Sequence, residues 1–525
     1  MKDWFSECKN NHAACRGKEL RLPTRVLQIS KLSSGGPVLK LIEYSGMQAS
    51  YVALSYRWLP ESAFKLTSAN YATYLQEVPW VNLPAVFHNA VAVCDIIGVQ
   101  YLWIDSLCIL QDSAKDWEQE SGRMQDVYRN ADLVIAANLP TSASKENPFL
   151  GPRHEHLIEP VGFYNVPNKD EKVEIFLRPF LGHFRGITED EPLAHRGWTY
   201  QEKLLARRCL TYTMREMQWL CTEKGMCECN EANNDAASDF RPETMLVGKT
   251  QVEIYDAWYH NVLYIYTRRA LTYDTDRLPA LAGAAKLFQE ALGDEYLAGL
   301  WKGDLLRGLG WKAPPSVDLT SKRMDGKTPS WSWASVNHSV VFQRGDFCTP
   351  FTEVVDAKTR TSDSSPFGLV DGGYITLRGP LGEGWIEFPE NGMLNGNSSV
   401  YIRATVGYPD YWSFYFYPDS QMVLQSRKDQ LTGTEPANHL SVPEMITDES
   451  NSALQRHDGR KGKVWCLCLG IILESGRWVY MSALVLSRDE ANTNQFRRLG
   501  TIQTMVVSKE DQPFASATME TVTIV

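Results

Sequence analysis

From about residue 50 onward, short runs of consecutive apolar residues alternate along the chain with stretches in which apolar residues recur at helical spacing. Short apolar runs with β-prone residues occupy 51–56, 100–104 and 133–137, and their length and composition are typical of buried strands. Between them, residues 83–99 and 113–131 repeat apolar positions at helical spacing. This alternation predicts a βαβαβ unit, with a parallel sheet covered on both faces and right-handed crossovers.

The second helical stretch makes a sharper prediction. Its apolar stripe comprises Trp117, Met124, Tyr128 and Ala131, so we expect one continuous helix with these side chains buried. Ser113 and Asp116 have the spacing of a capping box at the helix start. The exposed amides of that helix end could support an anion such as pyrophosphate.

The chain divides into four regions by pattern. Residues 1–48 form an N-terminal entry segment with a strand-like stretch, and 49–230 form the α/β domain. Helical spacing over 231–328 predicts a helical extension. From 329 to 525, β-prone runs separated by Gly, Pro, Asn or Asp predict a mostly antiparallel β-rich domain. A length of 525 residues fits several packed cores rather than one.

Composition narrows the function classes. Asp and Glu (63) exceed Lys and Arg (53), which argues against a protein that binds nucleic acid through a generally basic surface. The N-terminus lacks the apolar core of a signal peptide, and no apolar run is long enough to cross a bilayer. We therefore expect a cytoplasmic protein without a membrane partner.

The cysteines fit a reducing compartment. Their number, eleven, is odd, and their neighbours are largely apolar, which indicates reduced thiols rather than a disulfide framework. Zinc ligands could come from Cys221, Cys227 and Cys229, with Cys8, His12 or Cys15 as a distant fourth. The spacing lacks a paired CxxC on each side, so buried or loop thiols are favoured and no metal site is predicted.

Three sequence blocks occur in a fixed order. They are ALSYRW at 53–58, YLWIDSLCILQD at 101–112 continuing through Trp117 and Met124 to YRNA at 128–131, and RGWTYQE at 196–202. Together they resemble the fungal heterokaryon incompatibility (HET) domain. Further similarity to larger HET proteins lies at 271–272, 276–280, 296–301 and 329–335.

The resemblance implies a fold and a function. HET domains act as effectors of cell death in fungal non-self recognition. They are distantly similar to TIR domains, whose flavodoxin-like fold in some members cleaves NAD at the nicotinamide ribosyl bond with a helix-borne glutamate. The implied fold class is therefore α/β with a flavodoxin/TIR-like parallel sheet. NAD is then a possible substrate, no bound cofactor is expected, and the implied partners are a second copy or another signalling protein.

The first block departs from the family pattern. The family usually carries Cys and then Gly around its tryptophan, whereas Arg57 precedes Trp58 here and Leu59 and Pro60 follow it. We expect a first loop of altered shape.

Two carboxylates are the candidate catalytic residues. Ligands of open α/β sheets bind beyond the carboxyl ends of the strands, where Asp105 follows a wholly apolar run. Glu120 flanks the apolar stripe of the second helix and could stabilise an oxocarbenium-like charge. Alternatively, Asp105 ties a neighbouring loop through backbone amides, and Glu120 is a helix charge paired with Arg123.

Six further residues are candidates for substrate binding: Ser55, Tyr56, Arg57, Trp58, Ser106 and Arg196. Tyr56 or Trp58 could stack on a flat ring, and Arg57 could contact phosphate as a planar fork. Arg196, with Gln201 and Glu202, could reach the same cleft, although a structural role at a domain junction is favoured for this block.

Two other functions stay open at this point. The HET-like fold could serve assembly without catalysis. Alternatively, it could belong to a biosynthetic enzyme of fungal secondary metabolism, in which the aromatic residues at 411–412 and 414–416 help to line an apolar pocket.

Overall fold

The computed structural model comprises two compact units. The first contains residues 1–248 and 280–284, and the second contains 249–279 and 285–525. The structure describes residues 1–16, 21–31, 36–44, 47–58, 64–138, 149–151, 160–165, 172–176, 192–213, 216–228, 241–317, 323, 327–362, 365–388, 393–394, 398–403, 411–420, 422–423, 460–474, 478–488, 495–505, 514 and 517–525.

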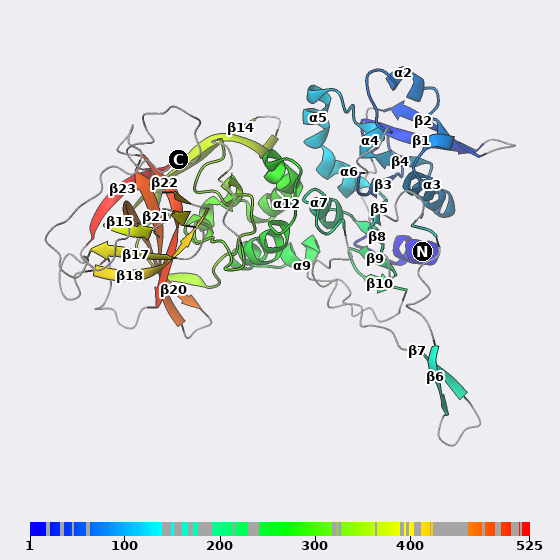
Figure 1. Ribbon diagram of the computed structural model, residues 1–525. Helices are drawn as coiled ribbons and strands as arrows, with labels where there is room; N and C mark the ends of the chain where they lie inside the picture. The colour runs from blue at the N-terminus through cyan, green and yellow to red at the C-terminus, as the bar shows by residue number, and fades with distance from the viewer. Residues whose placement is uncertain are drawn as a thin grey trace. The chain divides into compact units, whose positions relative to one another are not determined.

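An eight-stranded sheet organises the first unit, in the order β10-β9-β8-β5-β3-β4-β1-β2 (Figure 1). At its centre β3 (Val52–Ser55) pairs in parallel with β4 (Tyr101–Ile104) and β5 (Leu133–Ala137), and β5 pairs in parallel with β8 (Arg208–Tyr212). Every residue of these four strands is buried. The predicted parallel core is therefore confirmed, because strands covered on both faces are apolar throughout.

The sheet as a whole is mixed rather than parallel. On one side β1 (Arg25–Lys31) pairs antiparallel with β4 and with β2 (Pro37–Glu43). On the other side β9 (Met217–Cys221) pairs antiparallel with β8 and with β10 (Gly225–Cys227). The hairpins β1–β2, β8–β9 and β9–β10 have short connections, which permit antiparallel but not parallel pairing.

Two helical segments follow β3 and β4. Helix α3 (Ala85–Ile97) ends at Gly98, whose φ of 75° is a left-handed conformation that glycine adopts readily. The single helix predicted after β4 is wrong, because the chain forms α5 (Ala114–Ser121) and α6 (Met124–Asn130) instead. The break at residues 122–123 changes the helical phase, so Trp117 is 38% exposed and Glu120 is only 4% exposed.

The start of α5 is capped partly as predicted. The Ser113 side chain accepts a hydrogen bond from the Asp116 amide. The Asp116 carboxylate, however, binds Arg25 and the Leu110 amide. The remaining elements of the unit are α1 (Lys2–Asn11), α2 (Tyr71–Tyr74), η1 (Trp80–Asn82), α4 (Asp105–Cys108), β6 (Pro160–Asn165), β7 (Lys172–Phe176), α7 (Thr199–Leu204) and α9 (Pro242–Leu246).

Helices open the second unit. A capping box between Thr250 and Glu253 starts α10 (Gln251–Ala257). The π-helix η3 (Trp258–Leu263) and then α11 (Tyr264–Tyr266) continue it. Further elements are η4 (Asp274–Arg277), η5 (Pro279–Leu281), α12 (Ala282–Leu292), η6 (Lys302–Asp304), α13 (Leu305–Gly308) and η7 (Trp333–Ser335), and the boundary between the units crosses η5 and α12.

A tight turn brings two of the sequence blocks together. The strands β11 (Tyr296–Leu297) and β12 (Leu300–Trp301) form a short hairpin around Gly299. The Gly299 carbonyl accepts hydrogen bonds from the indoles of Trp258 and Trp333, both at 3.0 Å. A side chain at Gly299 would lie 2.2 Å from the Trp333 ring, and its φ of 97° disfavours other residues. The blocks 296–301 and 329–335 thus pack as one structural feature.

Mostly antiparallel strands form the rest of the second unit, as predicted, and only β22 and β23 pair in parallel among its described strands. Its nine-stranded sheet contains β13 (Asp346–Pro350), β14 (Glu353–Ser362), β15 (Ser365–Phe388), β17 (Ser398–Arg403), β18 (Tyr411–Pro418), β20 (Arg460–Glu474), β21 (Trp478–Arg488), β22 (Gln495–Met505) and β23 (Thr518–Ile524). The pairings run β15-β17-β18-β22-β21-β20 and return to β15, which closes a ring. The small ladder β16 (Met393–Leu394) with β19 (Met422–Val423) stands apart.

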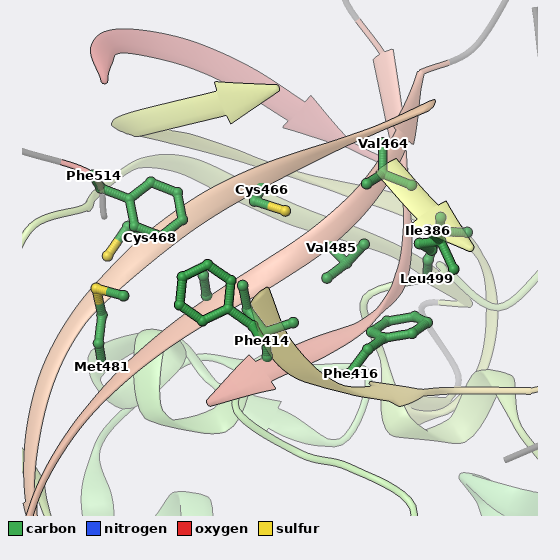
Figure 2. Packing of buried hydrophobic residues seen from close by; sticks show 12 residues of the cluster. Ile386, Phe414, Phe416, Val464, Cys466, Cys468, Met481, Val485, Leu499 and Phe514 are labelled. Atoms are coloured by element: carbon green, nitrogen blue, oxygen red, sulfur yellow. The ribbon is translucent and has the colours of Figure 1, made fainter. Parts of the chain in front are cut away.

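Apolar side chains from this ring form a compact core. Figure 2 shows Phe414 and Phe416 packed among Cys466, Val485 and Leu499. Both phenylalanines are at most 3% exposed. Phe414 and Phe416, two of the aromatic residues considered as pocket lining, therefore pack in the core.

A buried ion pair links the ring to the preceding segment. Asp419 and Arg498 are both fully buried, and Arg498 donates to the two carboxylate oxygens from Nε at 2.9 Å and Nη2 at 3.0 Å. Arg323 adds a third bond to Asp419 at 2.7 Å. Arg498 also donates to the carbonyls of Leu309 and Trp311. Each charge in this pair is thus compensated by well-placed partners.

A candidate active site at the carboxyl ends of the parallel strands

Polar side chains gather where β3 and β4 end. The first parallel strand, β3, lies between β4 and β5, so the direction of strand addition reverses at β3. Such reversal points are where open α/β sheets bind ligands. Ser55 is the last residue of β3, and Asp105 follows the last residue of β4.

Asp105 is held by two donors. Its Oδ2 accepts from the Trp58 indole at 2.7 Å, and its Oδ1 accepts from the Ser106 amide at 2.6 Å. Burial raises the pKa of Asp105, while the bonds from Trp58 and Ser106 and the charge of Arg196 oppose this. The predicted backbone contact is thus present, together with an indole contact that a simple loop tie does not need.

Tyr56 joins the neighbouring segments. Its hydroxyl donates to Ser106 Oγ at 2.8 Å, and its carbonyl accepts from Arg196 Nη1 at 2.8 Å. Its ring packs edge-on against Phe87 with centroids 5.2 Å apart, and the residue is only 7% exposed. Of the two aromatic candidates for stacking, Trp58 is therefore the accessible one, being half-buried.

Glu202 is a functional candidate that the sequence reasoning underrated. It lies on α7 with 5% exposure, and no group in the described part of the chain hydrogen-bonds its Oε2. Burial raises its pKa to about 7, while hydrogen bonding to Ser55 and Tyr128 and the charge of Arg196 oppose the shift. The charge of Asp105 adds to the rise. A buried, incompletely satisfied carboxyl that titrates near neutral pH is typical of catalytic sites.

Residues in the block at 196–202 have two different roles. Gln201 accepts a hydrogen bond from the Gly283 amide at 3.2 Å and is therefore structural. Glu202 and Arg196 belong instead to the Asp105 cluster. Successive helical residues point about 100° apart, so the sequence itself indicated that Gln201 and Glu202 cannot share one partner.

Glu120 occupies a different network. Its Oε1 accepts from Thr24 Oγ1 at 2.9 Å and lies 3.5 Å from Arg123 Nη1, so the alternative pairing with Arg123 is confirmed. The structure groups Glu120 with these residues rather than among the donors around Asp105. Arg57 is exposed, and residues 59–63, where the first block departs from the family, lie outside the described residues.

The Asp105 cluster therefore unites most of the predicted residues. It contains Ser55, Tyr56, Trp58, Asp105, Ser106 and Arg196 from the prediction, and adds Tyr128 and Glu202. Asp105, Trp58 and Arg196 are partly exposed, so the cluster reaches the surface. It offers two carboxyls, one guanidinium and an indole to a ligand.

Comparison with known proteins finds a similarity in this part of the chain. Residues 51–202 match the family model described as heterokaryon incompatibility protein (HET). No curated protein and no solved structure matches the chain. Among the described residues, no helix has the length and apolar character needed to span a membrane. The matched segment contains the whole Asp105 cluster and ends at Glu202, so the cluster lies within the part of the chain that is similar to the HET family.

Proposed function

We propose that the HET domain is an effector of fungal non-self recognition and cell death that cleaves NAD at the nicotinamide ribosyl bond. The observation that carries this proposal is Glu202, a buried carboxyl with an unbonded oxygen and a pKa of about 7, near Asp105 and Arg196. Enzymes that cleave glycosidic bonds commonly use two carboxyl groups whose different environments give them different pKa values.

The chemistry is a hydrolysis. The bond between the ribose C1′ and the nicotinamide nitrogen breaks, and its electron pair leaves with neutral nicotinamide. Water adds its oxygen to C1′, and its proton passes to a carboxylate and then to solvent, which gives ADP-ribose. Ionised Glu202 stabilises the positive charge that develops on the ribose. Arg196 offers a charge for the pyrophosphate, and Trp58 a ring face for the nicotinamide.

The proposal assigns NAD as a substrate, so no resident cofactor is required. It also includes self-association, or association with another signalling protein, as the step that activates the domain. The competing hypothesis is that Glu120, and not Glu202, is the catalytic glutamate. The bonds to Thr24 and Arg123 favour a structural role for Glu120.

One observation weighs against the biosynthetic alternative. A cavity of about 550 Å³ in the second unit is bordered by Arg323, Lys327, Arg360 and Arg497. These side chains suit an anionic ligand better than an apolar one. With Phe414 and Phe416 in the core, the aromatic segment gives little support to a pocket for an apolar substrate.

The test is release of nicotinamide from NAD by the purified full chain, measured chromatographically over a range of protein concentrations. We expect Glu202→Gln and Asp105→Asn to lower turnover by about 100-fold or more. Glu120→Gln serves as the matched carboxylate control and should retain turnover within about threefold. Circular dichroism spectra confirm that each variant is folded.

Each contrary outcome has a defined meaning. Wild-type turnover in Glu202→Gln would remove Glu202 from the site, and loss of turnover in folded Glu120→Gln alone would restore Glu120. If no concentration of wild-type protein releases nicotinamide, the proposed activity is wrong and a role in assembly is favoured.

A further inference from the structure

Four potential metal ligands meet at one point of the first unit. Their ligating atoms all lie within 4.8 Å of one another, and the residues are Cys8, His12, Cys15 and Cys221. Each is buried, with exposures of 0%, 8%, 0% and 2% in that order. Three thiols and an imidazole thus face one another in a region closed to solvent.

The local structure explains how they converge. Cys8 lies on α1 and His12 caps the end of that helix, so their four-residue separation places them on one face. Cys15 follows in a turn, and Cys221 ends β9. Figure 1 shows α1, at the end marked N, beside the strands β8 to β10.

The spacing suits a tetrahedral ion. His12 Nδ1 lies 3.3 Å from Cys221 Sγ. Zinc bonds of about 2.3 Å to sulfur and about 2.0 Å to nitrogen place two tetrahedral ligands roughly 3.5 Å apart. Two sulfur ligands would be roughly 3.8 Å apart by the same geometry. Small side-chain adjustments within the 4.8 Å limit would therefore bring all four atoms onto one ion.

The surroundings suit bound thiolates. The Lys224 amide donates to Cys221 Sγ at 3.3 Å, and Arg208 Nε donates to Cys8 Sγ at 3.2 Å. Arg208 also donates to the Cys15 carbonyl at 2.7 Å, which fixes the turn that carries Cys15. Three thiolates and a neutral imidazole on a divalent ion leave one negative charge beside the buried Arg208 guanidinium, which also pairs with Asp132 at 3.0 Å.

We propose that Cys8, His12, Cys15 and Cys221 bind one zinc ion as a closed structural site. Four protein ligands leave no position for water, and three sulfur ligands with one nitrogen ligand in tetrahedral spacing select zinc among common divalent ions. The site differs from the cysteine grouping considered from sequence, because Cys227 lies outside it and Cys229 lies outside the described residues. Zinc here would fasten α1 to the hairpin β9–β10.

Metal analysis of the full chain, purified under reducing conditions without a metal-affinity tag, tests the proposal. We expect about one zinc per chain by mass spectrometry. Replacement by Co²⁺ should give thiolate-to-cobalt charge-transfer absorption and the intense visible bands of a tetrahedral site. His12→Ala should weaken these bands, and Cys221→Ser should lower zinc affinity by at least about tenfold.

Controls separate metal loss from misfolding. Cys94→Ala changes a buried cysteine of α3 outside the group and should keep one zinc per chain. The cobalt spectrum of the wild-type protein does not depend on any variant folding. Zinc below about 0.1 per chain, both as purified and after addition of Zn²⁺ to reduced protein, overturns the proposal. A disulfide among the three cysteines in protein never exposed to oxidant would also overturn it.

Discussion

Two buried carboxylates, one in each unit, are treated in opposite ways. Asp419 is fully buried and accepts three charged hydrogen bonds from Arg498 and Arg323. Glu202 is nearly as buried, yet its Oε2 has no hydrogen-bond partner in the described residues, and its pKa is raised to about 7. Similar burial therefore accompanies very different degrees of compensation.

The two carboxyl groups suit different purposes, one the stability of the fold and the other the binding of a ligand. A carboxylate surrounded by guanidinium groups holds the chain together, but it has no capacity left for a ligand. A carboxyl with an unbonded oxygen destabilises the fold when it ionises, and it gains partners only when something binds. This contrast predicts that substitutions at the two positions change different measurements.

The largest expected effect is on stability, from Asp419→Asn. The change leaves the buried Arg498 and the partly buried Arg323 without their shared counter-charge, which should lower the free energy of unfolding by about 3–5 kcal/mol. Urea denaturation measures the loss. As a control, Glu353→Gln removes an exposed pair with Arg378 and should change the free energy by less than about 0.5 kcal/mol. Equal losses in the two variants would contradict the idea that a buried ion pair contributes more to stability than an exposed one.

The second prediction concerns the pH dependence of stability at Glu202. Its pKa is raised from 4.5 in the unfolded chain to about 7 in the folded one, so the folded state binds the extra proton between these values. This stabilisation is complete below pH 4.5 and is lost as pH rises through 7. The loss is roughly 3 kcal/mol, at about 1.4 kcal/mol per pKa unit.

Glu202→Gln isolates that contribution. Urea denaturation of wild type and variant between pH 4.5 and 7.5 should show the wild type losing stability relative to the variant as pH rises. A constant difference across this range would show that Glu202 ionises normally. Glu202 would then not differ from Asp419 in the way proposed.

A smaller effect is expected from Trp58→Phe. The change removes the hydrogen bond from the indole to Asp105 Oδ2, which lowers the pKa of that carboxyl. The pKa of Asp105 should rise further, and the free energy of unfolding near neutral pH should fall by about 1–2 kcal/mol. NMR titration of carboxyl-labelled aspartate in both proteins measures the shift. A pKa unchanged by the substitution would mean that the indole does not support the ionised form.

The smallest effect is expected from Glu120→Gln. The amide oxygen can still accept from Thr24, so what is lost is the attraction of the Glu120 charge to Arg25 and to the half-exposed Arg123. We expect a stability loss of about 1 kcal/mol or less by urea denaturation. A loss as large as that of Asp419→Asn would place Glu120 with the structural carboxylates.

The spacing of apolar residues predicted where the central strands lie, but it did not predict which strands pair with one another. The runs that became β3, β4 and β5 are apolar throughout, because both faces of these strands are covered. The pairing of β1 with β4 and with β2 could not be predicted, since a strand-like stretch does not specify the edge that it joins. The break between α5 and α6 was also missed, although Gly122 lies there.

The position of a candidate residue in the fold could be predicted where it depends only on the neighbouring sequence. Asp105 follows a strand directly, so its place at the carboxyl edge could be predicted from local pattern. Glu202 lies on a helix whose orientation depends on distant contacts, such as that between Gln201 and Gly283. Its raised pKa comes chiefly from burial, which no short sequence window reveals.

The mixed sheet also decides where a shortened protein can begin and end. The family match covers 51–202, yet β1 and β2 precede it and β8 follows it. A fragment cut at these limits would expose the backbone edges of both β4 and β5, each of which offers unpaired groups to another chain. Expression trials that keep residues 1–248 therefore retain the sheet's natural borders, whereas trials of the matched segment alone invite aggregation.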